Sequence, residues 1–238
     1  VLFRSLWTNA GVLVRNLGDP RQALRLFDRA WEAAREIGDL ATQANVRLNR
    51  GLAWSLDLDS PVEARREFTA AAELARRSGD HAEIVQTLFY LGRFELTQGQ
   101  LIAAEAAFAT ALGEARESDN AEGRWSALEG LGRVALQRHD PRRAAQLFGE
   151  AVVEIERTRR RLSDRRGRAG YFGDRRGAYE GWIHATLSEG SEGAATRAVE
   201  IAEAARARDL LDIWQSDGVA PATRLQARTD RPPSLVFF

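Results

Sequence analysis

Residues 7–30 read WTNAGVLVRNLGDPRQALRLFDRA, and modified forms of this stretch recur three more times along the 238-residue chain. Four of its positions repeat in register: a glycine, an alanine, a phenylalanine and a second alanine. They are Gly11, Gly51, Gly92 and Gly132; Ala23, Ala64, Ala104 and Ala144; Phe27, Phe68, Phe108 and Phe148; and Ala30, Ala71, Ala111 and Ala151. Spacings of four and three residues keep side chains on one helix face. The sequence therefore predicts one helical hairpin written four times.

Turn residues independently mark the ends of these helices. Aspartate or serine before proline is typical of a capping side chain followed by the first helical residue, and it occurs at Asp19-Pro20, Ser60-Pro61 and Asp140-Pro141. Gly38-Asp39 and Gly79-Asp80 are typical of a left-handed helix stop followed by the cap of the next helix. The predicted helices are 4–17, 20–37, 41–56, 61–78, 81–98, 101–118, 121–138 and 141–162, and no strand is expected.

These motifs resemble the tetratricopeptide repeat (TPR) family. The first copy carries the TPR signature in Trp7, Ala10, Gly11 and Val14, followed by Ala23, Phe27 and Ala30, and Leu88-x-x-Leu91-Gly92 and Leu128-x-x-Leu131-Gly132 repeat its first half. The resemblance implies an all-α, right-handed superhelical solenoid of four regular hairpins plus a divergent fifth. One hairpin cannot bury its apolar face alone, so neighbouring hairpins share a core. Arg47, Arg50 and Glu95 depart from the pattern because apolar or aromatic residues are usual there.

The pattern changes after Ala151, where an arginine-rich run replaces the short glycine junction. We expect a divergent helical hairpin with helices at about 169–187 and 194–214. Residues 1–5 are interpreted as a non-native or truncated start, 6–162 as four TPR-like repeats, 163–214 as the divergent hairpin, and 215–238 as a linker or the truncated start of a following domain.

A second resemblance covers about residues 154–214. It rests on Ile155-Glu156-Arg157, Arg161-Leu162-Ser163, Tyr171-Phe172, Tyr179-Glu180 and the phrase Ala202-Glu203-x-x-Arg206-Ala207-Arg208-Asp209-Leu210-Leu211-Asp212. These residues resemble the TPR region that precedes the peptidase domain of CHAT proteins, which are caspase-like cysteine peptidases. The resemblance implies a sensor or scaffold segment for a protease domain beyond residue 238.

Composition narrows the functional classes. Arginine supplies all 34 basic side chains, and 34 carboxylates balance them, so net charge does not predict nucleic-acid binding. The chain has no cysteine, which removes disulfides, thiolate metal sites and cysteine nucleophiles from these residues. No apolar run is long enough to cross a bilayer. The arginine-rich, lysine-free composition favours a bacterial origin, and a cytoplasmic location is the default expectation.

No catalytic residue, metal site or cofactor is predicted. His81, His139 and His184 each fit a structural position, and no two of them have the spacing of metal ligands. Asp57-x-Asp59 is interpreted as a pair of capping groups rather than a cation site. Gly130-x-Gly132 falls inside a predicted helix, which excludes a dinucleotide loop.

The predicted binding surface is the concave groove lined by the first helix of each hairpin, because a solenoid presents those side chains in rows. The repeat register nominates Thr8, Arg15, Asn45, Asn49, Gln86, Phe89, Arg93, Glu129, Arg133 and Gln137. Arg93 and Arg133 occupy the same repeat position, where they could grip a peptide carboxylate or could simply pair with Glu129 and nearby acids. Binding of chaperone tails is not expected, because the lysines that such a clamp needs are absent.

A secondary candidate is an anion patch at the junction with the divergent hairpin. It comprises Arg159, Arg160, Arg161, Arg165, Arg166 and Arg168, beside Gly167-x-x-Gly170-x-x-Gly173. Charge runs of this kind are usually solvated faces, so a nucleic-acid partner is not the leading hypothesis.

Three functional hypotheses follow. The leading one is a non-enzymatic scaffold that binds a protein or peptide partner, including its own downstream domain, as the recognition part of a larger bacterial signalling protein. The first alternative is the TPR segment of a CHAT peptidase. The second is the regulatory arm of a nucleotide-switch or DNA-binding protein.

Overall fold

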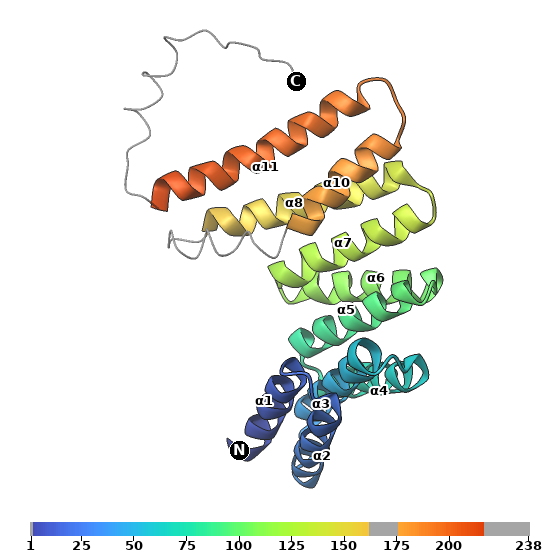
Figure 1. Cartoon of the computed structure of the whole chain (residues 1–238), viewed down its shortest axis with the longest axis vertical. Helices are drawn as coiled ribbons and strands as arrows, with labels where there is room; N and C mark the ends of the chain where they lie inside the picture. Colours follow the sequence, from blue (N-terminus) through green and yellow to red (C-terminus); the bar gives the residue numbers. More distant parts are fainter. Residues whose placement is uncertain (1, 162–175, 217–238) are drawn as a thin grey trace.

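The computed structural model describes residues 2–161 and 176–216, with side chains for 6–161 and 176–206, and the regular structure in these residues is entirely helical. Successive helices pair into hairpins that stack along one direction (Figure 1). The first, or A, helices are α1 (Leu2–Asn16), α3 (Leu40–Leu52), α5 (His81–Thr97), α7 (Ala121–Gln137) and α10 (Arg176–Ser188). The second, or B, helices are α2 (Pro20–Glu36), α4 (Pro61–Ser78), α6 (Leu101–Glu117), α8 (Pro141–Arg161) and α11 (Ala194–Ser216). The predicted all-α helical-repeat fold is confirmed.

The array bends toward its A helices. Each A helix contacts the A helix of the next hairpin, as α5 does with α7, whereas neighbouring B helices such as α4 and α6 have few or no close backbone approaches. Elements on the inside of a curve lie closer together than those on the outside. The A helices therefore line the inner face of the array, which is where the groove is predicted.

The four repeated phenylalanines form the core, as the sequence predicts. Phe27, Phe68, Phe108 and Phe148 are at most 1 % exposed. The repeated glycine of the same hairpin lies directly against each ring, and a β-carbon at Gly92 would approach Phe108 Cε1 to 2.8 Å. A β-carbon at Gly130 of the next A helix would also approach Phe108 Cε1, to 2.5 Å. Glycine is needed at both positions because a side chain would overlap the ring.

Most of the predicted helix ends are confirmed. Asp19 Oδ1 accepts a hydrogen bond from the Gln22 N–H at 2.9 Å, and Asp140 Oδ1 accepts one from the Arg143 N–H at 3.0 Å. Gly38 and Gly79 take the left-handed backbone, each with φ of 70°. The expectation for Ser60 is wrong, because its hydroxyl donates to the Leu58 carbonyl at 3.2 Å and makes no capping bond.

The second hairpin has one more residue than the others between its repeated glycine and alanine, and the structure inserts it within the helix. Helix α3 ends at Leu52 and continues as a π-helical turn, η1 (Ala53–Asp57). Such a turn absorbs one residue without breaking the helix. Asp57 and Asp59 are not the capping pair that was expected: Asp57 pairs with Arg15 at 3.7 Å, and Asp59 adopts a left-handed φ of 47°.

The three charged departures from the repeat pattern are members of ion pairs between helices. Glu67 of α4 is fully buried, and its carboxylate lies 2.8 Å from Arg47 Nη1 and 3.2 Å from Arg50 Nη2. Arg47 also stacks over the Trp31 ring at 4.2 Å. Buried carboxylates are tolerated when they are paired. The two arginines of α3 that depart from the repeat pattern therefore neutralise the buried glutamate of the next helix.

Glu95, in the third hairpin, also forms an ion pair with an arginine of a neighbouring helix. It is buried in α5, and Arg65 of α4 donates to both of its carboxylate oxygens at 2.8 Å, through Nε and Nη2. The Arg65 guanidinium also lies 5.3 Å from the Phe94 ring centroid. This bidentate salt bridge joins the second hairpin to the third, at the repeat position where TPRs usually have an aromatic contact.

Candidate functional site

The candidate site is a pocket of about 370 Å³ on the A-helix face, between the first turns of α5 and α7. This volume falls within the range of about 300–1,000 Å³ that is typical of ligand-binding pockets. The lining residues are Asp80, Ala82, Glu83, Val85, Gln86, Phe89 and Tyr90 on one side, and Asn120, Glu122, Gly123 and Ser126 on the other. Of the predicted groove residues, Gln86 and Phe89 line this pocket.

Helix caps fix the rim of the pocket. Asp80 Oδ1 accepts hydrogen bonds from the N–H groups of Ala82 at 2.9 Å and Glu83 at 3.3 Å. On the opposite side, Asn120 Oδ1 accepts from the Gly123 N–H at 2.8 Å. These bonds satisfy amides at the helix starts that would otherwise face the pocket.

Gly123 allows the start of α7 to approach α5 closely. A β-carbon there would lie 2.5 Å from Val85 Cγ1 and 2.9 Å from Ala115 Cβ. Any larger residue would push the two helices apart, so this glycine sets the width of the pocket.

Glu83 is the electrostatically unusual group of the site. Burial, together with a smaller effect of the neighbouring Asp80 carboxylate, raises the pKa of its carboxyl from 4.5 to about 7. Its Oε1 atom is buried and has no hydrogen-bond partner among the described residues. A carboxyl with this pKa is about half ionised near neutral pH. A raised pKa combined with a buried oxygen that lacks a hydrogen-bond donor is typical of groups in functional sites.

Aromatic rings form one wall of the pocket. Phe89 and Tyr90 meet edge to face at 5.4 Å, and Phe89 packs on the core ring of Phe108 at 6.1 Å. The Arg93 guanidinium lies 5.7 Å from the Phe89 centroid and 6.0 Å from the Tyr90 centroid. Within the described residues, no carboxylate lies within ion-pair distance of Arg93, which leaves its charge available to a ligand.

Arg133 differs from Arg93 although both occupy the same repeat position. Its Nε and Nη2 donate to Glu129 Oε1 at 3.0 and 2.7 Å. Helix α10 closes over this pair, because a β-carbon at Gly177 would lie 2.9 Å from Glu129 Oε1. The sequence left two roles open for Arg133, and the structure contains the pairing with Glu129.

The predicted groove residues of the first two hairpins bond within the protein. Thr8 is 7 % exposed, so its predicted place on the groove surface is wrong. Arg15 pairs with Asp57. Asn49 Nδ2 donates to the Asn45 carbonyl at 2.9 Å and to Asn45 Oδ1 at 3.1 Å. Gln137 is exposed at the end of α7, distant in sequence from the pocket-lining first turn.

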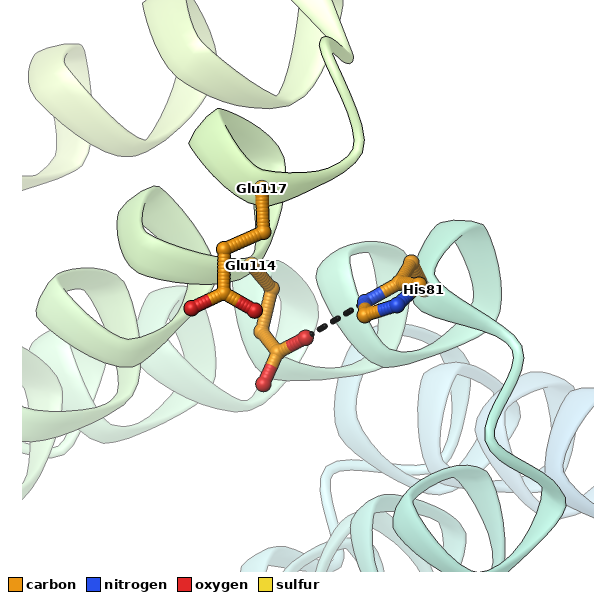
Figure 2. A group of neighbouring side chains, drawn as sticks. All are labelled: His81, Glu114 and Glu117. Carbon is orange, nitrogen blue, oxygen red and sulfur yellow. Dashed lines mark hydrogen bonds and ion pairs between the residues drawn. The ribbon is translucent and has the colours of Figure 1, made fainter.

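A second polar cluster lies where α5 begins and α6 ends (Figure 2). The His81 Nδ1 atom is 2.8 Å from Glu114 Oε2, and Glu117 places a third ligand atom within 4.8 Å of the other two. The set offers one imidazole nitrogen and two carboxylate oxygens, which are ligand types for a divalent cation. Two of the three residues are exposed, and the hydrogen bond from α5 to α6 already accounts for two of the side chains.

The predicted anion patch is only partly described. Arg159 Nε donates to Glu156 Oε2 at 3.2 Å, and Arg160 Nε donates to the Glu156 carbonyl at 3.3 Å. Arg161 is exposed at the end of α8. Arg165, Arg166 and Arg168 lie outside the described residues, as does the segment Gly167-x-x-Gly170-x-x-Gly173. Two of the six arginines are thus bound to one glutamate of their own helix.

A larger cavity of about 520 Å³ lies between α8, α10 and α11. Its wall is mainly apolar, with Val152, Trp182 and Ile201 among the lining residues. Several of its polar groups bond to one another, as Arg197 does to Glu189 at 2.7 Å. We place the candidate site at α5 and α7 instead, because of these two pockets only that one is lined by a residue with a buried polar atom that lacks a hydrogen-bond partner among the described residues.

Solved structures share the arrangement of these helices. BtubC (BKLC) from P. vanneervenii superposes with a TM-score of 0.68 at 17 % identity, covering 96 % of this chain and 84 % of that one. The TPR-like repeats of a kinesin light chain from Podosopora anserina give 0.63 at 12 % identity, covering 86 % and 95 %. The chain has a TPR-like fold.

A further TPR-like match is the Rap conjugation gene regulator of the plasmid pLS20 in complex with the Phr* peptide, with a TM-score of 0.51 at 17 % identity, covering 88 % of this chain and 60 % of that one. No protein-family model and no curated protein matches the sequence. Within the described residues of this TPR-like chain, no helix combines the length and apolarity needed to span a bilayer.

Proposed function

We propose that this chain is a non-enzymatic interaction scaffold that binds a peptide segment of a protein partner along its A-helix face. The observation that carries the proposal is the pocket between α5 and α7, which contains the buried Glu83 oxygen without a donor. A buried polar atom without a partner costs free energy unless a ligand supplies one. The inner face of a solenoid offers such a ligand a row of similar positions.

Peptide binding by a similar structure supports the proposal. The Rap regulator that shares this fold was solved with a peptide bound. An extended peptide suits the A-helix face because its side chains can enter successive gaps between helices. Within that face, Gln86 and Phe89 are the predicted contacts that line the pocket.

Photo-crosslinking of selected peptides tests the proposal. Peptides would be selected from a displayed library of fragments from the source genome, and a photoreactive amino acid would replace either Gln86 or Thr110. Both positions are exposed, but Gln86 lies on A helix α5 and Thr110 on B helix α6. We expect the peptides to crosslink at position 86 and to spare position 110. Crosslinking at position 110 alone would contradict the proposal.

The biological setting is proposed at a finer level. We propose that the scaffold is the cytoplasmic recognition arm of a larger bacterial signalling protein. In the CHAT alternative, a caspase-like histidine and cysteine follow residue 238 in the complete reading frame. In the alternative in which the chain is the regulatory arm of a nucleotide-switch or DNA-binding protein, a phosphate loop or a DNA-binding helix-turn-helix accompanies the repeats. Sequencing the parent gene decides among the three, because each demands a different neighbouring domain.

A further inference from the structure

We propose that the pocket between α5 and α7 selects a single cationic side chain, arginine or lysine, from the bound segment. This inference rests on the proposed peptide-binding function and adds the chemistry of the residue that is recognised. It replaces the expectation of an acidic segment gripped by Arg93 and Arg133.

The charges that line the pocket favour a cation. Asp80, Glu83 and Glu122 place three carboxyl groups around it, and no basic side chain is among its described lining residues. Asp80 precedes α5, Glu83 lies in its first turn, and Glu122 projects from the first turn of α7. A guanidinium or ammonium group is the natural partner of such a set.

The positive ends of the two helices do not reverse this preference. Each helix start contributes about half a positive charge, against a full negative charge for each ionised carboxylate. The first-turn amides are also engaged, since Asp80 accepts from Ala82 and Glu83, and Asn120 accepts from Gly123. An anion would therefore find few free amides and would meet carboxylates.

Glu83 gives the pocket a defined acceptor. Its Oε1 is buried and has no donor, and burial and Asp80 together raise the pKa of its carboxyl to about 7. A bound guanidinium or ammonium would donate to this oxygen and lower that pKa, so binding would release a proton. The other titratable groups that line the pocket are Asp80 and Tyr90 on the same side as Glu83 and Glu122 on the opposite side. His81, beside the rim, bonds Glu114 of α6 instead.

The arginines predicted to bind an acidic segment are poorly placed for that role. Arg133 is held by two hydrogen bonds to Glu129. Arg93 remains available, but it stands over the rings of Phe89 and Tyr90 and outside the set of pocket-lining residues. One arginine outside a pocket that is lined by three carboxyl groups does not make an acidic peptide the favoured ligand.

The test uses a positional-scanning library of eight-residue peptides with blocked ends and no histidine, applied to the whole chain. We expect arginine or lysine to be enriched at one position. Replacing that residue of the best peptide by a neutral isostere, citrulline for arginine, should weaken binding at least about tenfold. Affinity for the wild-type protein should rise about tenfold from pH 6 to pH 8, as Glu83 becomes ionised.

Three variants complete the design. Glu83→Gln should weaken the cationic peptide at least about tenfold at pH 8 and remove the pH dependence. Glu73→Gln removes an equal charge from an exposed position on α4 and should leave binding within about twofold. His81→Gln should keep the pH dependence, because His81 bonds Glu114 of α6 and is not among the residues that line the pocket.

The outcomes separate this inference from the proposed function. If the peptides that bind the A-helix face are enriched in an acidic or an apolar residue instead, the proposed cation preference is wrong. The proposed scaffold function would still be supported by that result. The same holds if Glu83→Gln and Glu73→Gln weaken binding equally. If no peptide in either library crosslinks to the A-helix face, both proposals fail.

Discussion

Exchanging Gly92 and Phe108 for alanine, singly and together, tests the packing that holds the hairpins together. Phe108 is completely buried between Gly92 of its own hairpin and Gly130 of the next. Truncation of a buried phenylalanine costs about 3–5 kcal/mol. We expect Phe108→Ala to fall in the upper half of that range, because two helix backbones flank the ring and limit collapse.

The effect of Gly92→Ala should depend on Phe108. In the wild type, the new β-carbon would lie 2.8 Å from the ring, and such overpacking costs about 1–3 kcal/mol. In the Phe108→Ala background the overlap is gone, and alanine should then stabilise the helix by about 0.5–1 kcal/mol relative to glycine. The effect of this substitution on stability thus changes sign between the two backgrounds, which corresponds to a coupling of about 1.5–4 kcal/mol.

Urea denaturation followed by circular dichroism measures all four proteins. Gly113→Ala is the matched control, because Gly113 lies in α6 with no atom within 4 Å of its β-carbon position. It should stabilise both backgrounds alike, by about 0.5–1 kcal/mol. If the effects of Gly92→Ala and Phe108→Ala simply add, the ring does not occupy the space above Gly92, and the packing described here is refuted.

Four further substitutions have defined outcomes in the same denaturation assay. Glu67→Ala should cost about 3 kcal/mol, because it leaves two partly buried arginines without their carboxylate. Glu83→Gln should stabilise the protein more at pH 8 than at pH 5. The folded protein holds the Glu83 proton up to about pH 7 and the unfolded chain only to about 4.5, so this carboxyl lowers stability as pH rises through that window. The added advantage should be about 1–2 kcal/mol after allowance for partial exposure. Asp140→Ala should cost about 1 kcal/mol, and Ser60→Ala under about 0.5 kcal/mol, since only the aspartate caps its helix.

The repeat made most of the fold predictable from sequence. The four phenylalanines identified the core because they recur at the same position of each hairpin, which a chance pattern would not do. The π-helical turn at Ala53–Asp57 was not predicted, since a one-residue insertion looks the same in sequence whether a loop or a helix absorbs it. The pairing of Glu67 and Glu95 with arginines was also missed, because these contacts join residues 17 to 30 positions apart.

The candidate site was only half predictable. Repeat register nominated Gln86 and Phe89, and both line the pocket between α5 and α7. Glu83 and Glu122 were missed because a glutamate in a first helical turn is ordinarily a solvated residue. A signal was nevertheless present: Asp80 and Asn120 are equivalent cap positions of successive A helices, so their neighbouring first turns could have been expected to face each other.

The pKa of Glu83, with and without a cationic peptide, tests the central claim most directly. The measurement is an NMR titration of the Glu83 side-chain carboxyl carbon. We predict that the pKa of this carboxyl is about 7 in the free protein and falls by at least about one unit when an arginine-containing peptide is bound. A pKa that the bound peptide leaves unchanged would contradict the claim that this pocket receives a cationic side chain beside Glu83.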